Sequence, residues 1–390
     1  MQTKKLLFSG WRNSHHSFAM VHQNQLLAAL KHSDLQIYHQ DMPLLMNHWN
    51  AKDHNPGFSN EDYSKILNVR DFNEEEVDCV YRICAPMFPP NKIAKRTLTF
   101  TITEVGFDHR SLSNADLQPS AYTQDNNLVI TSSRWSRDRL IDYGFAEDKV
   151  RIVSCGVNTS TFRPLSKEEF IQQRTALQIP LDSVVFINVG APIWTKGIDL
   201  LLKAFCRVHF KFPTARLILK DGQALYGLAL ADVLINFERE NPGLLTENVL
   251  SAISVISKSL AQFQMRALYG LADWYVSPYR AEGFNLPVLE AQACGTPVII
   301  SSGGATDDFC NNPGVKKIAS IFCKGTLGNT QGCAWVEPNL DCLVTLMEEA
   351  AAAGPRSPAQ QHDLQKELLE NATQFTWDKA TDSLLKLMKN

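Results

Sequence analysis

From Lys5 to Ser154, short apolar runs alternate with helical patterns in which apolar residues recur every three to four positions. Helices are predicted at Phe18–Leu30 and at Ser133–Tyr143, the second of which ends at Gly144. The apolar runs that predict strands are Lys5–Ser9, Leu35–Tyr38, Cys79–Ile83, Leu98–Ile102, Leu128–Thr131 and Val150–Ser154. Strands that alternate with helices predict a parallel, doubly wound sheet. The stretch 42–73 is polar and irregular, and its pattern assigns no element.

A second series of the same kind follows Pro180. Its strands are predicted at Val184–Val189, Ala215–Leu219, Ala272–Ser277 and Pro297–Ile300, and its helices at Asp199–Phe210, Ala224–Glu240, Gln262–Gly270 and Ala291–Gly295. Turn residues at 163–166 and 180–182 indicate a domain boundary between the two series. Pro355 and Pro358 mark another break, after which two short helices finish the chain. The pattern therefore predicts an α/β fold of two Rossmann-like, doubly wound domains with a cleft between them.

The length and the charge of the chain fit this organisation. At 390 residues the chain is longer than one hydrophobic core usually supports, so two domains are expected. The net charge is −3, and no basic run could form a groove, which argues against nucleic acid as a partner. The cluster Lys92–Arg96 could touch anionic lipid as a peripheral membrane contact, although a solvated loop is the simpler interpretation.

The cysteines indicate a reducing compartment. There are nine of them, scattered along the chain, and no two have the C-x-x-C spacing. This pattern argues against a disulfide framework and against a structural zinc site. No stretch approaches the roughly 18 apolar residues of a membrane span, and the apolar patch after Lys5 is too short for a signal peptide. We therefore expect a cytoplasmic protein.

Two glutamates eight positions apart, Glu282 and Glu290, are the strongest indication of chemistry in the sequence. They follow the predicted strand Ala272–Ser277, with Glu282 in a loop and Glu290 in the opening of the next helix. Ligands of open α/β sheets bind at the carboxyl ends of the strands. Two carboxylates beside a helix N-terminus suit a ligand with hydroxyls and phosphate, such as a sugar nucleotide. Glu290 alone could simply favour the helix dipole, but that explanation does not cover Glu282.

The residues between the two glutamates predict how this helix begins. Asn285 is the expected N-cap, and Pro287 fits the first turn, where its missing N–H costs nothing. The unpaired backbone N–H groups of Gly283, Phe284, Asn285 and Leu286 would then face the ligand.

A glycine-bearing loop with a lysine joins the first strand of the second series to its helix. Gly190 lets the backbone turn at the end of the strand. Lys196 stands just before the helix, where its ammonium group and nearby N–H groups could neutralise a diphosphate; a surface lysine at the end of a loop is the alternative. A second loop carries the glycines 303–304, which permit either a phosphate-binding nest or a turn into a helix capped by Thr306 or Asp307.

The first domain offers candidates for contacts with a second substrate. Gly10 ends the first predicted strand, at a position from which a loop would face the cleft. His15, His16 and His22 follow it, and any of them could serve as a general base, although a lone histidine is more often structural. The loop after Leu98–Ile102 offers Glu104 and His109 for acceptor contacts, with their neighbours Thr103 and Asp108. Pattern and spacing thus predict a two-domain cleft enzyme for a phosphorylated, hydroxyl-rich ligand, and nothing more specific.

Several segments resemble one enzyme family. Glu282–Glu290, followed by Ala291–Val298, closely resembles the Glu-X7-Glu signature of retaining glycosyltransferases of family 4, which have the GT-B fold. Val189–Gly190 with Lys196–Phe205 is similar to that family's phosphate-binding loop and helix, and 153–164 to its interdomain segment. Phe375–Trp377 looks like the start of the family's last helix, which packs back onto the first domain. The resemblance covers about residues 128 to 390 well and the first 125 weakly.

The resemblance implies a division of labour between the domains. An acceptor-binding domain would comprise residues 1–170, joined by the helix 374–390, and a nucleotide-sugar-binding domain would comprise residues 171–373. Lys196 would bind the donor diphosphate and stabilise the leaving group, Glu282 would hold the hydroxyls of the transferred sugar, and Glu290 would bind the ribose. Backbone groups at 283–286 would lie nearby, and Gly10 would let the first domain approach the diphosphate.

The family transfers sugar with retention of configuration and usually without a metal. The acceptor hydroxyl attacks on the face of the leaving group, whose phosphate takes the proton, so a protein base is unnecessary. The resemblance therefore predicts a retaining, metal-independent glycosyltransferase without a cofactor. Its donor would be a UDP-, GDP- or ADP-linked sugar, and its acceptor a glycan, a lipid-linked saccharide or a similar molecule.

One departure from the family pattern favours a second hypothesis. The family commonly has arginine directly after the glycine of the phosphate loop, where this chain has Ala191. Losing one of two cations near the developing charge would usually slow catalysis, unless another cation, such as Arg12 or Arg280, compensates. The alternative is a catalytically weak homologue that acts as a nucleotide-binding or scaffold subunit. An epimerase or phosphorylase reading has no supporting motif.

Overall fold

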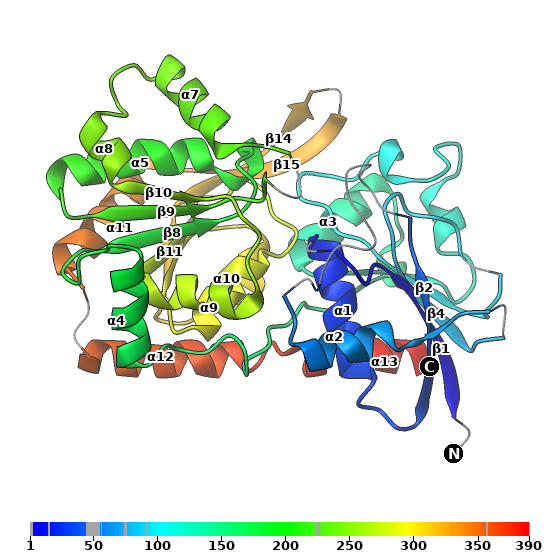
Figure 1. Ribbon diagram of the computed structural model, residues 1–390. Helices are drawn as coiled ribbons and strands as arrows, with labels where there is room; N and C mark the ends of the chain where they lie inside the picture. Colours follow the sequence, from blue (N-terminus) through cyan, green and yellow to red (C-terminus); the bar gives the residue numbers. More distant parts are fainter. Residues whose placement is uncertain are drawn as a thin grey trace. The chain divides into compact units, whose positions relative to one another are not determined.

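The protein consists of two α/β units in a computed structural model (Figure 1). The structure describes residues 3–14, 16–43, 55, 57–73, 76–90, 92–223, 227–328, 330–355 and 358–389. The first unit comprises Met1–Gly156, Gly325–Cys333 and Phe375–Asn390. The second comprises Val157–Lys324 and Ala334–Gln374. The division at residues 156 and 157 precedes the boundary at residues 170 and 171 that the sequence suggested.

The described residues of the first unit form a seven-stranded parallel sheet in the order β3-β2-β1-β4-β5-β6-β7. The strands are β1 (Lys4–Gly10), β2 (Leu35–Asp41), β3 (Arg70–Asp71), β4 (Cys79–Ile83), β5 (Thr97–Phe100), β6 (Leu128–Thr131) and β7 (Val150–Ile152). The helices are α1 (Ser17–Ala29), α2 (Asn60–Leu67), α3 (Arg134–Tyr143) and α13 (Trp377–Lys389), with short 3-10 turns at η1 (His109–Ser111), η2 (Pro119–Tyr122) and η3 (Glu147–Lys149). The strand order reverses between the parallel strands β1 and β4, so the topological switch point of this unit lies there.

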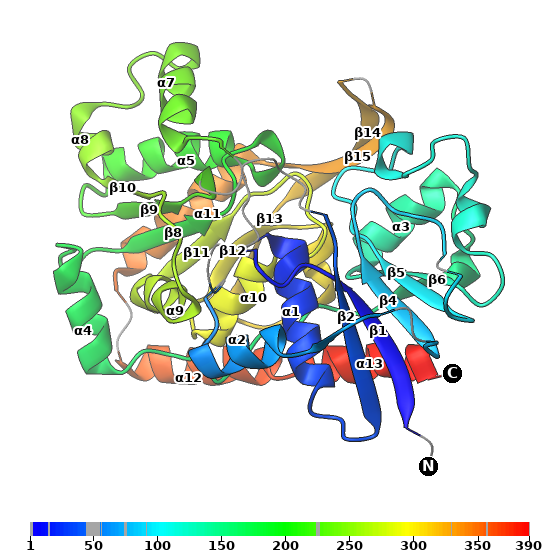
Figure 2. The ribbon, with the colours of Figure 1, turned by 45° about the vertical axis from the view of Figure 1, so that its right-hand side comes forward.

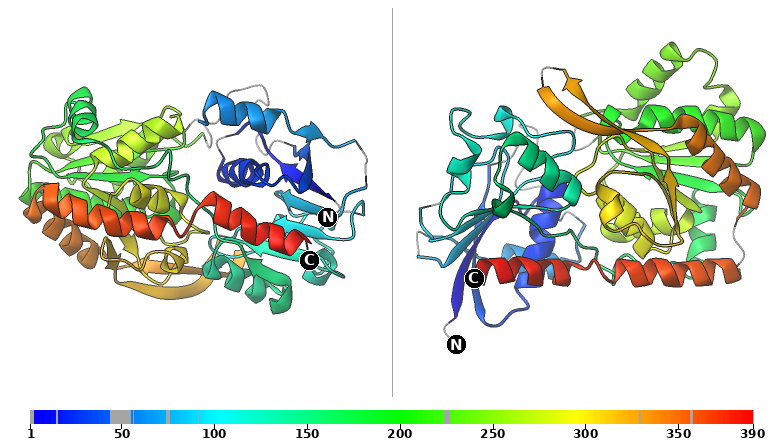
Figure 3. Two further views of the ribbon diagram at one scale, coloured as in Figure 1. Left: turned by 90° about the horizontal axis from the view of Figure 1, so that it is seen from below. Right: turned by 180° about the vertical axis from the view of Figure 1, so that it is seen from behind.

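The last helix, α13, packs against α1 inside the first unit. Its apolar side chains Leu384, Leu385 and Met388 are buried. The Nζ atom of Lys4 donates a 2.6 Å hydrogen bond to the carbonyl of Lys389, so the two ends of the described chain lie together (Figure 3). A helix from the end of the chain therefore completes the core of the first unit.

The second unit has a six-stranded parallel sheet in the order β10-β9-β8-β11-β12-β13 among its described residues. The strands are β8 (Val185–Val189), β9 (Arg216–Lys220), β10 (Ile253–Ile256), β11 (Trp274–Ser277), β12 (Val298–Ser301) and β13 (Val315–Ile318), and β14 (Ser320–Leu327) pairs with β15 (Thr330–Pro338) in a separate ribbon. The helices are α4 (Lys167–Ala176), α5 (Ile198–Lys211), α7 (Leu230–Glu240), α8 (Glu247–Ser251), α9 (Gln262–Leu271), α10 (Leu286–Ala293), α11 (Leu340–Ala353) and α12 (Pro358–Ala372), with η4 (Trp194–Lys196) and η5 (Ala305–Asp308). The strand order of this sheet reverses between the parallel strands β8 and β11.

Helices cover both faces of this second sheet, as the sequence predicts for a parallel sheet. In Figure 2, α5 and α11 lie on one face, and α9 and α10 lie on the other. The apolar stripe of α5 packs with the strands into one core. Its fully buried side chains include Phe186, Leu201, Phe205, Val276 and Ile299. The fold predicted from the sequence, two Rossmann-like doubly wound domains, is confirmed.

One prediction about local structure is wrong. The helix expected at Ala224–Glu240 begins only at Leu230. Gly227 has a φ of 68°, which is a left-handed conformation outside the helix; residues 224–226 lie outside the described residues. The stretch 42–73, to which the pattern assigned nothing, contains α2 and β3. The Ser59 side chain caps α2 by accepting from the N–H of Asp62.

A buried ion pair joins α4 to the sheet of the second unit. The guanidinium of Arg174, which is 0% exposed, lies 2.7 Å from the carboxylate of Asp273 and donates to the carbonyls of Leu271 and Ser183. The same carboxylate accepts from the N–H of Val185 at 2.8 Å. Removal of the cation would leave a buried charge without its partner, which is far more costly than loss of an exposed pair.

We predict that Arg174→Met lowers the free energy of unfolding of the second unit by about 3–5 kcal/mol, measured by chemical denaturation. The control is Arg207→Met. The Arg207–Asp341 pair has a similar distance, 2.8 Å, but its side chains are 53% and 86% exposed, so its loss should cost less than about 1 kcal/mol. Equal losses in the two variants would contradict the prediction.

Candidate functional site

The loops after β8 and β11 meet at the carboxyl edge of the second sheet, where the strand order reverses. The carbonyl of Thr195 accepts hydrogen bonds from the N–H groups of Arg280, at 2.7 Å, and Ala281, at 3.2 Å. Gly197 has a φ of 68°, and a Cβ there would collide with the carbonyl oxygen of Pro278. Only glycine permits this approach, so the two loops are held together by their backbones.

This contact brings together Lys196, from the end of η4, and Glu282, from the loop between β11 and α10. The Nζ atom of Lys196 lies 2.8 Å from Oε2 of Glu282, and the two side chains are 18% and 10% exposed. Gly190, the third predicted residue of this group, directly follows β8, and its N–H donates to the carbonyl of Lys220 at 3.0 Å. The sequence placed the lysine and the glutamate on two loops of the same domain, and the structure pairs their side chains directly.

Glu290 lies in α10, but not in the first turn that the sequence suggested. The helix begins at Leu286, so Glu290 belongs to its second turn. The carboxylate accepts a 2.7 Å hydrogen bond from the Tyr269 hydroxyl. Burial raises the pKa of Glu290 to about 7, and the Tyr269 hydrogen bond offsets part of that shift. A contribution to the helix dipole does not explain the position of Glu290; a carboxyl group this close to neutrality is typical of a functional site.

In the segment 283–286, the side chains of Phe284 and Asn285 are both used within the protein. The ring of Phe284 is stacked on that of Phe309, with centroids 4.6 Å apart. Asn285 occupies the N-cap position, as predicted, but its side chain makes no capping hydrogen bond. Its backbone is left-handed, with a φ of 74°, and its side-chain amide donates to the Ser277 hydroxyl at 3.1 Å. This hydrogen bond fixes the end of β11 to the start of α10.

The second glycine loop does not form the capped helix that was one of its two interpretations. The short turn η5 begins at Ala305, after Gly304 at the N-cap position, and both Thr306 and Asp307 lie inside it. The carboxylate of Asp307 accepts from the N–H of Gly303 at 2.8 Å, which occupies a donor that a nest would need. A Cβ on Gly304 would collide with the Tyr279 ring. The loop therefore packs closely against Tyr279, which follows β11.

In the first unit, Gly10 and His22 are joined by packing. A Cβ on Gly10 would collide with the imidazole of His22, which is 0% exposed. The Nε2 atoms of His22 and His39 lie 2.9 Å apart. Burial, followed by the neighbouring His39, lowers the pKa of His22 well below its usual value. This burial disfavours an acceptor contact for His22, which stays a prediction.

The other candidates of the first unit lie on loops. His16 caps α1, since its Nδ1 accepts from the N–H of Phe18 at 3.2 Å, and burial lowers its pKa to about 4. His15 lies outside the described residues. Glu104 and His109 both lie after β5. The Glu104 carbonyl accepts from the Trp135 indole at 2.6 Å, and His109 is exposed at the start of η1. Their acceptor role remains a prediction.

The two arginines that could replace the cation missing at Ala191 are both engaged. Arg280 pairs with Asp199 at 2.7 Å and with Glu337 at 3.0 Å. Arg12, in the first unit, pairs with Asp41 and also lies 3.0 Å from Asp71. Neither guanidinium carries an uncompensated charge, so neither arginine is a ready substitute for the family's second cation.

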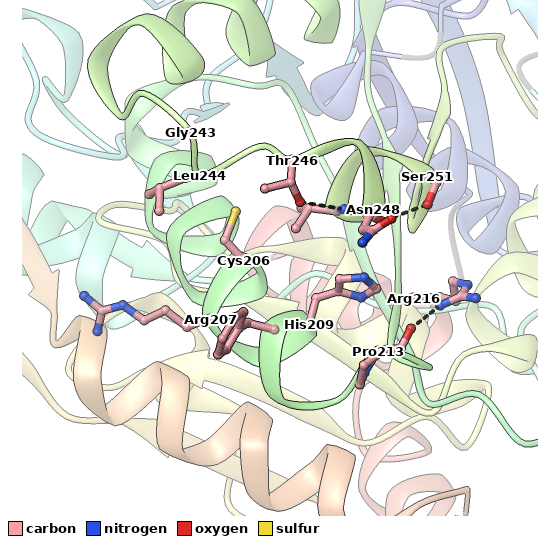
Figure 4. Close-up of a pocket in the computed structure, with 12 residues that line it drawn as sticks. Cys206, Arg207, His209, Pro213, Arg216, Gly243, Leu244, Thr246, Asn248 and Ser251 are labelled. Atoms are coloured by element: carbon pink, nitrogen blue, oxygen red, sulfur yellow. Dashed lines mark hydrogen bonds between the residues drawn. The ribbon is translucent and has the colours of Figure 1, made fainter.

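A cavity of about 620 Å³ in the second unit lies away from these residues (Figure 4). It is lined by the end of α5, the start of β9 and residues up to α8, at the amino ends of the strands. Several of its polar side chains are satisfied within the protein: Arg207 by Asp341, Arg216 by the carbonyls of Pro213 and Ala215, and Thr246 by the N–H of Val249. None of the predicted site residues lines it, so we place the candidate site at the carboxyl edge instead.

Three further observations bear on the predicted chemistry. All nine cysteines are free thiols. Within the described residues, no group of three or more His, Cys, Asp or Glu side chains could hold a metal ion. Among the helices that the structure describes, none is both long and apolar enough to cross a membrane.

Comparison with known proteins relates this geometry to one family. Residues 169–314 match the family model of glycosyl transferases group 1. D-inositol 3-phosphate glycosyltransferase of Mycobacterium tuberculosis (strain ATCC 25618 / H37Rv) is 28% identical over 262 residues, which cover 67% of this chain and 48% of that protein. The chain thus matches about half the length of this curated relative. The segment that matches the family model, residues 169–314, contains Lys196, Glu282 and Glu290.

Solved structures share the fold over nearly the whole chain at low sequence identity. A glycosyltransferase from Rickettsia africae has a TM-score of 0.69 and 14% identity, covering 99% of this chain and 98% of its own. HepE of Anabaena, in complex with UDP and glucose, has a TM-score of 0.67 and 12% identity, covering 99% of both chains. WaaG, a glycosyltransferase involved in lipopolysaccharide biosynthesis, has a TM-score of 0.62 and 14% identity, covering 99% of this chain and 100% of its own. These likenesses show the fold.

We predict that Glu290 makes the stability of the unliganded protein depend on pH. Because its pKa is raised from 4.5 to about 7, the folded state binds more protons than the unfolded state between these values. The stabilisation is fully present below pH 4.5 and is lost as the pH rises through 7. Relative to Glu290→Gln, the wild type should lose about 2 kcal/mol between pH 5 and 8, at about 1.36 kcal/mol per pKa unit less solvent screening. Chemical denaturation at both pH values measures this; a difference that does not change with pH would contradict it.

Proposed function

We propose that this chain, a group 1 glycosyltransferase with the GT-B fold, moves a sugar from a nucleotide-sugar donor to an acceptor hydroxyl with retention of configuration and without a metal. The observation that carries the proposal is the Lys196–Glu282 pair, 2.8 Å apart at the switch point of the second sheet. It puts a cation for phosphate beside an acceptor of hydroxyl hydrogen bonds. The UDP and glucose bound by HepE support a UDP-sugar donor.

The site residues would act as follows. Lys196 binds the diphosphate and balances the charge that develops on it. Glu282 accepts hydrogen bonds from the transferred sugar, and Glu290 from the ribose hydroxyls. The N–H groups at 283–286 add donors at the start of α10. An ionised Glu290 is the better acceptor, so donor binding would favour loss of its proton.

The reaction requires no base from the protein. The bond between the anomeric carbon and the diphosphate oxygen breaks, and the acceptor oxygen forms a bond to that carbon on the same face. The acceptor proton passes to the departing phosphate. This route agrees with the burial of His22 and the low pKa of His16, neither of which suits a general base near neutral pH.

The acceptor is proposed to be a glycan, a lipid-linked saccharide or a similar molecule, bound through the first unit. Glu104 and His109 would contribute polar contacts from the loop after β5. Peripheral contact of the Lys92–Arg96 cluster with anionic lipid is part of this proposal for lipid-linked acceptors.

The second candidate is a catalytically weak homologue that binds nucleotide and serves as a scaffold subunit. Ala191 favours it, because Arg280 and Arg12 are both paired with carboxylates. It predicts nucleotide binding without turnover, and activity only in a partner chain.

The central test incubates the purified protein with UDP-, GDP- and ADP-sugars and follows release of sugar by NMR, which identifies the anomer. We expect slow hydrolysis of one donor with retention. Lys196→Ala and Glu282→Ala should each lower turnover by more than about 100-fold. The control is Lys211→Met, which removes an exposed lysine paired with Glu348 at 2.6 Å and should leave turnover unchanged. No binding and no turnover with any donor would sink the proposal, whereas binding alone would favour the scaffold.

The ion pair itself gives a second prediction. In the unliganded protein, the Glu282 carboxylate forms an ion pair with Lys196. The diphosphate would bind the same ammonium group, so the carboxylate and the diphosphate compete for it. Glu282→Gln should therefore bind UDP about fivefold more tightly, as expected for loss of a competing pair worth about 1 kcal/mol, while sugar turnover falls. Lys196→Met should weaken UDP binding instead. Titration calorimetry measures both, and weaker UDP binding by Glu282→Gln would rule out the competition.

A further inference from the structure

Arg280 lies two positions before Glu282 on the loop between β11 and α10, and it is 5% exposed. Its Nη1 and Nη2 atoms donate to the two oxygens of Asp199 at 2.7 and 2.9 Å. Its Nε donates to Glu337 at 3.0 Å, and Nη1 also reaches the carbonyl of Trp194 at 3.1 Å. The guanidinium lies over the Trp194 ring, 4.9 Å from its centroid. All its nitrogens therefore have partners.

These partners come from three separate parts of the second unit. Trp194 belongs to η4, Asp199 to the first turn of α5 and Glu337 to β15. Arg280 thus holds the lysine-bearing loop from the side chain, while its own N–H holds the same loop through the Thr195 carbonyl at 2.7 Å. Within the described residues, its hydrogen bonds and ion pairs reach neither Lys196 nor Glu282.

The charge on Arg280 is not accounted for by stability alone. Burial lowers the pKa of Arg280, but the hydrogen bonds and charges of Asp199 and Glu337 outweigh that effect and raise it. A buried ion pair often adds little stability compared with apolar residues of the same volume. What a guanidinium adds is fixed geometry, since its planar fork orients two carboxylates and a carbonyl at once. A catalytic site that acts through preorganised charge requires such geometry.

We propose that Arg280 is a positioning residue of the donor site: it fixes the loop of Lys196 against the loop of Glu282, so that the ammonium and the carboxylate keep the spacing required by a diphosphate and the adjoining sugar. This inference rests on the proposed function. Arg280 acts through the two loops and touches no substrate.

The effect should be larger on turnover than on nucleotide binding. The flexible Lys196 side chain can follow a diphosphate when its loop shifts, so UDP affinity should fall by no more than about threefold. The sugar held by Glu282 must also stay aligned with the leaving group, and a displacement of about 1 Å can cost on the order of 100-fold in rate. Arg280→Met should therefore lower kcat by about 10- to 100-fold. Arg280→Lys, which cannot bridge both carboxylates, should recover only part of the loss.

The matched control is Arg266→Met. Arg266 has the same type of environment in the same unit: it pairs with both oxygens of Glu169, at 3.0 and 2.7 Å, and donates to the carbonyls of Arg163 and Pro164. The experiment measures Tm, the Kd for UDP, and kcat and KM for donor hydrolysis, in all variants and the wild type. The inference expects similar losses of Tm in Arg280→Met and Arg266→Met, but a fall in kcat only in the first.

A kcat for Arg280→Met equal to that of the wild type, or an equal fall in kcat in Arg266→Met, would overturn the inference while leaving the proposed function intact. Absence of turnover in the wild type would sink the proposed function and the inference with it. If Arg280→Met does not fold, Glu337→Gln replaces it, since that side chain is 41% exposed and tolerates loss of its charge. It should lower kcat about threefold with UDP affinity retained, and an unchanged kcat would overturn the inference.

Discussion

The carbonyl of Thr195 accepts two backbone hydrogen bonds from the loop after β11, and the candidate site depends on this contact. Parallel strands bring the ends of β8 and β11 to one edge, but strand pairing alone does not fix how closely the loops that follow them approach each other. That approach is set by Thr195 and by Gly197, whose missing side chain admits the carbonyl of Pro278. Lys196 lies between these two residues. Its contact with Glu282 is thus a consequence of backbone geometry, and the side-chain pair adds charge to an arrangement that already exists.

The sequence predicted the inner strands of both sheets, because buried parallel strands have the pattern of short apolar runs. It missed the edge strands β3, β10 and β13. Cys79–Ile83 and Leu128–Thr131 have the bounds of β4 and β6, since each is apolar in most positions and follows a polar residue. The helix expected at Ala224–Glu240 was wrong at its start because helical composition continues through Gly227, whose backbone is left-handed. The pattern of apolar residues does not report backbone dihedrals, so errors of this kind fall at the ends of elements.

The site divides in the same way. The sequence placed Lys196 and Glu282 on loops that each follow a strand of the second domain, but only the structure shows that β8 and β11 are adjacent and that the two side chains pair. The partners of Arg280 could not be found so: Asp199 and Glu337 are 81 and 57 positions away, and no local pattern connects them. Asn285 shows that a correctly predicted position does not settle what the side chain does. A residue type typical of N-caps stands at the N-cap position, yet its amide is used by Ser277, because a left-handed backbone turns the side chain away from the helix.

Donor recognition is easier to infer from this chain than acceptor recognition, and the reason is chemical. A diphosphate needs a cation and unpaired N–H groups, and a sugar needs a carboxylate, so a few residue types at strand ends mark the site in both sequence and structure. An acceptor presents only hydroxyls, which almost any polar side chain can bind. In the first unit, the polar residues near the strand ends largely satisfy one another: Arg12 with Asp41 and Asp71, and His22 with His39. Such internal pairing stabilises the edge of the sheet without marking a ligand, so the proposed acceptor contacts of Glu104 and His109 cannot be inferred from residue types alone.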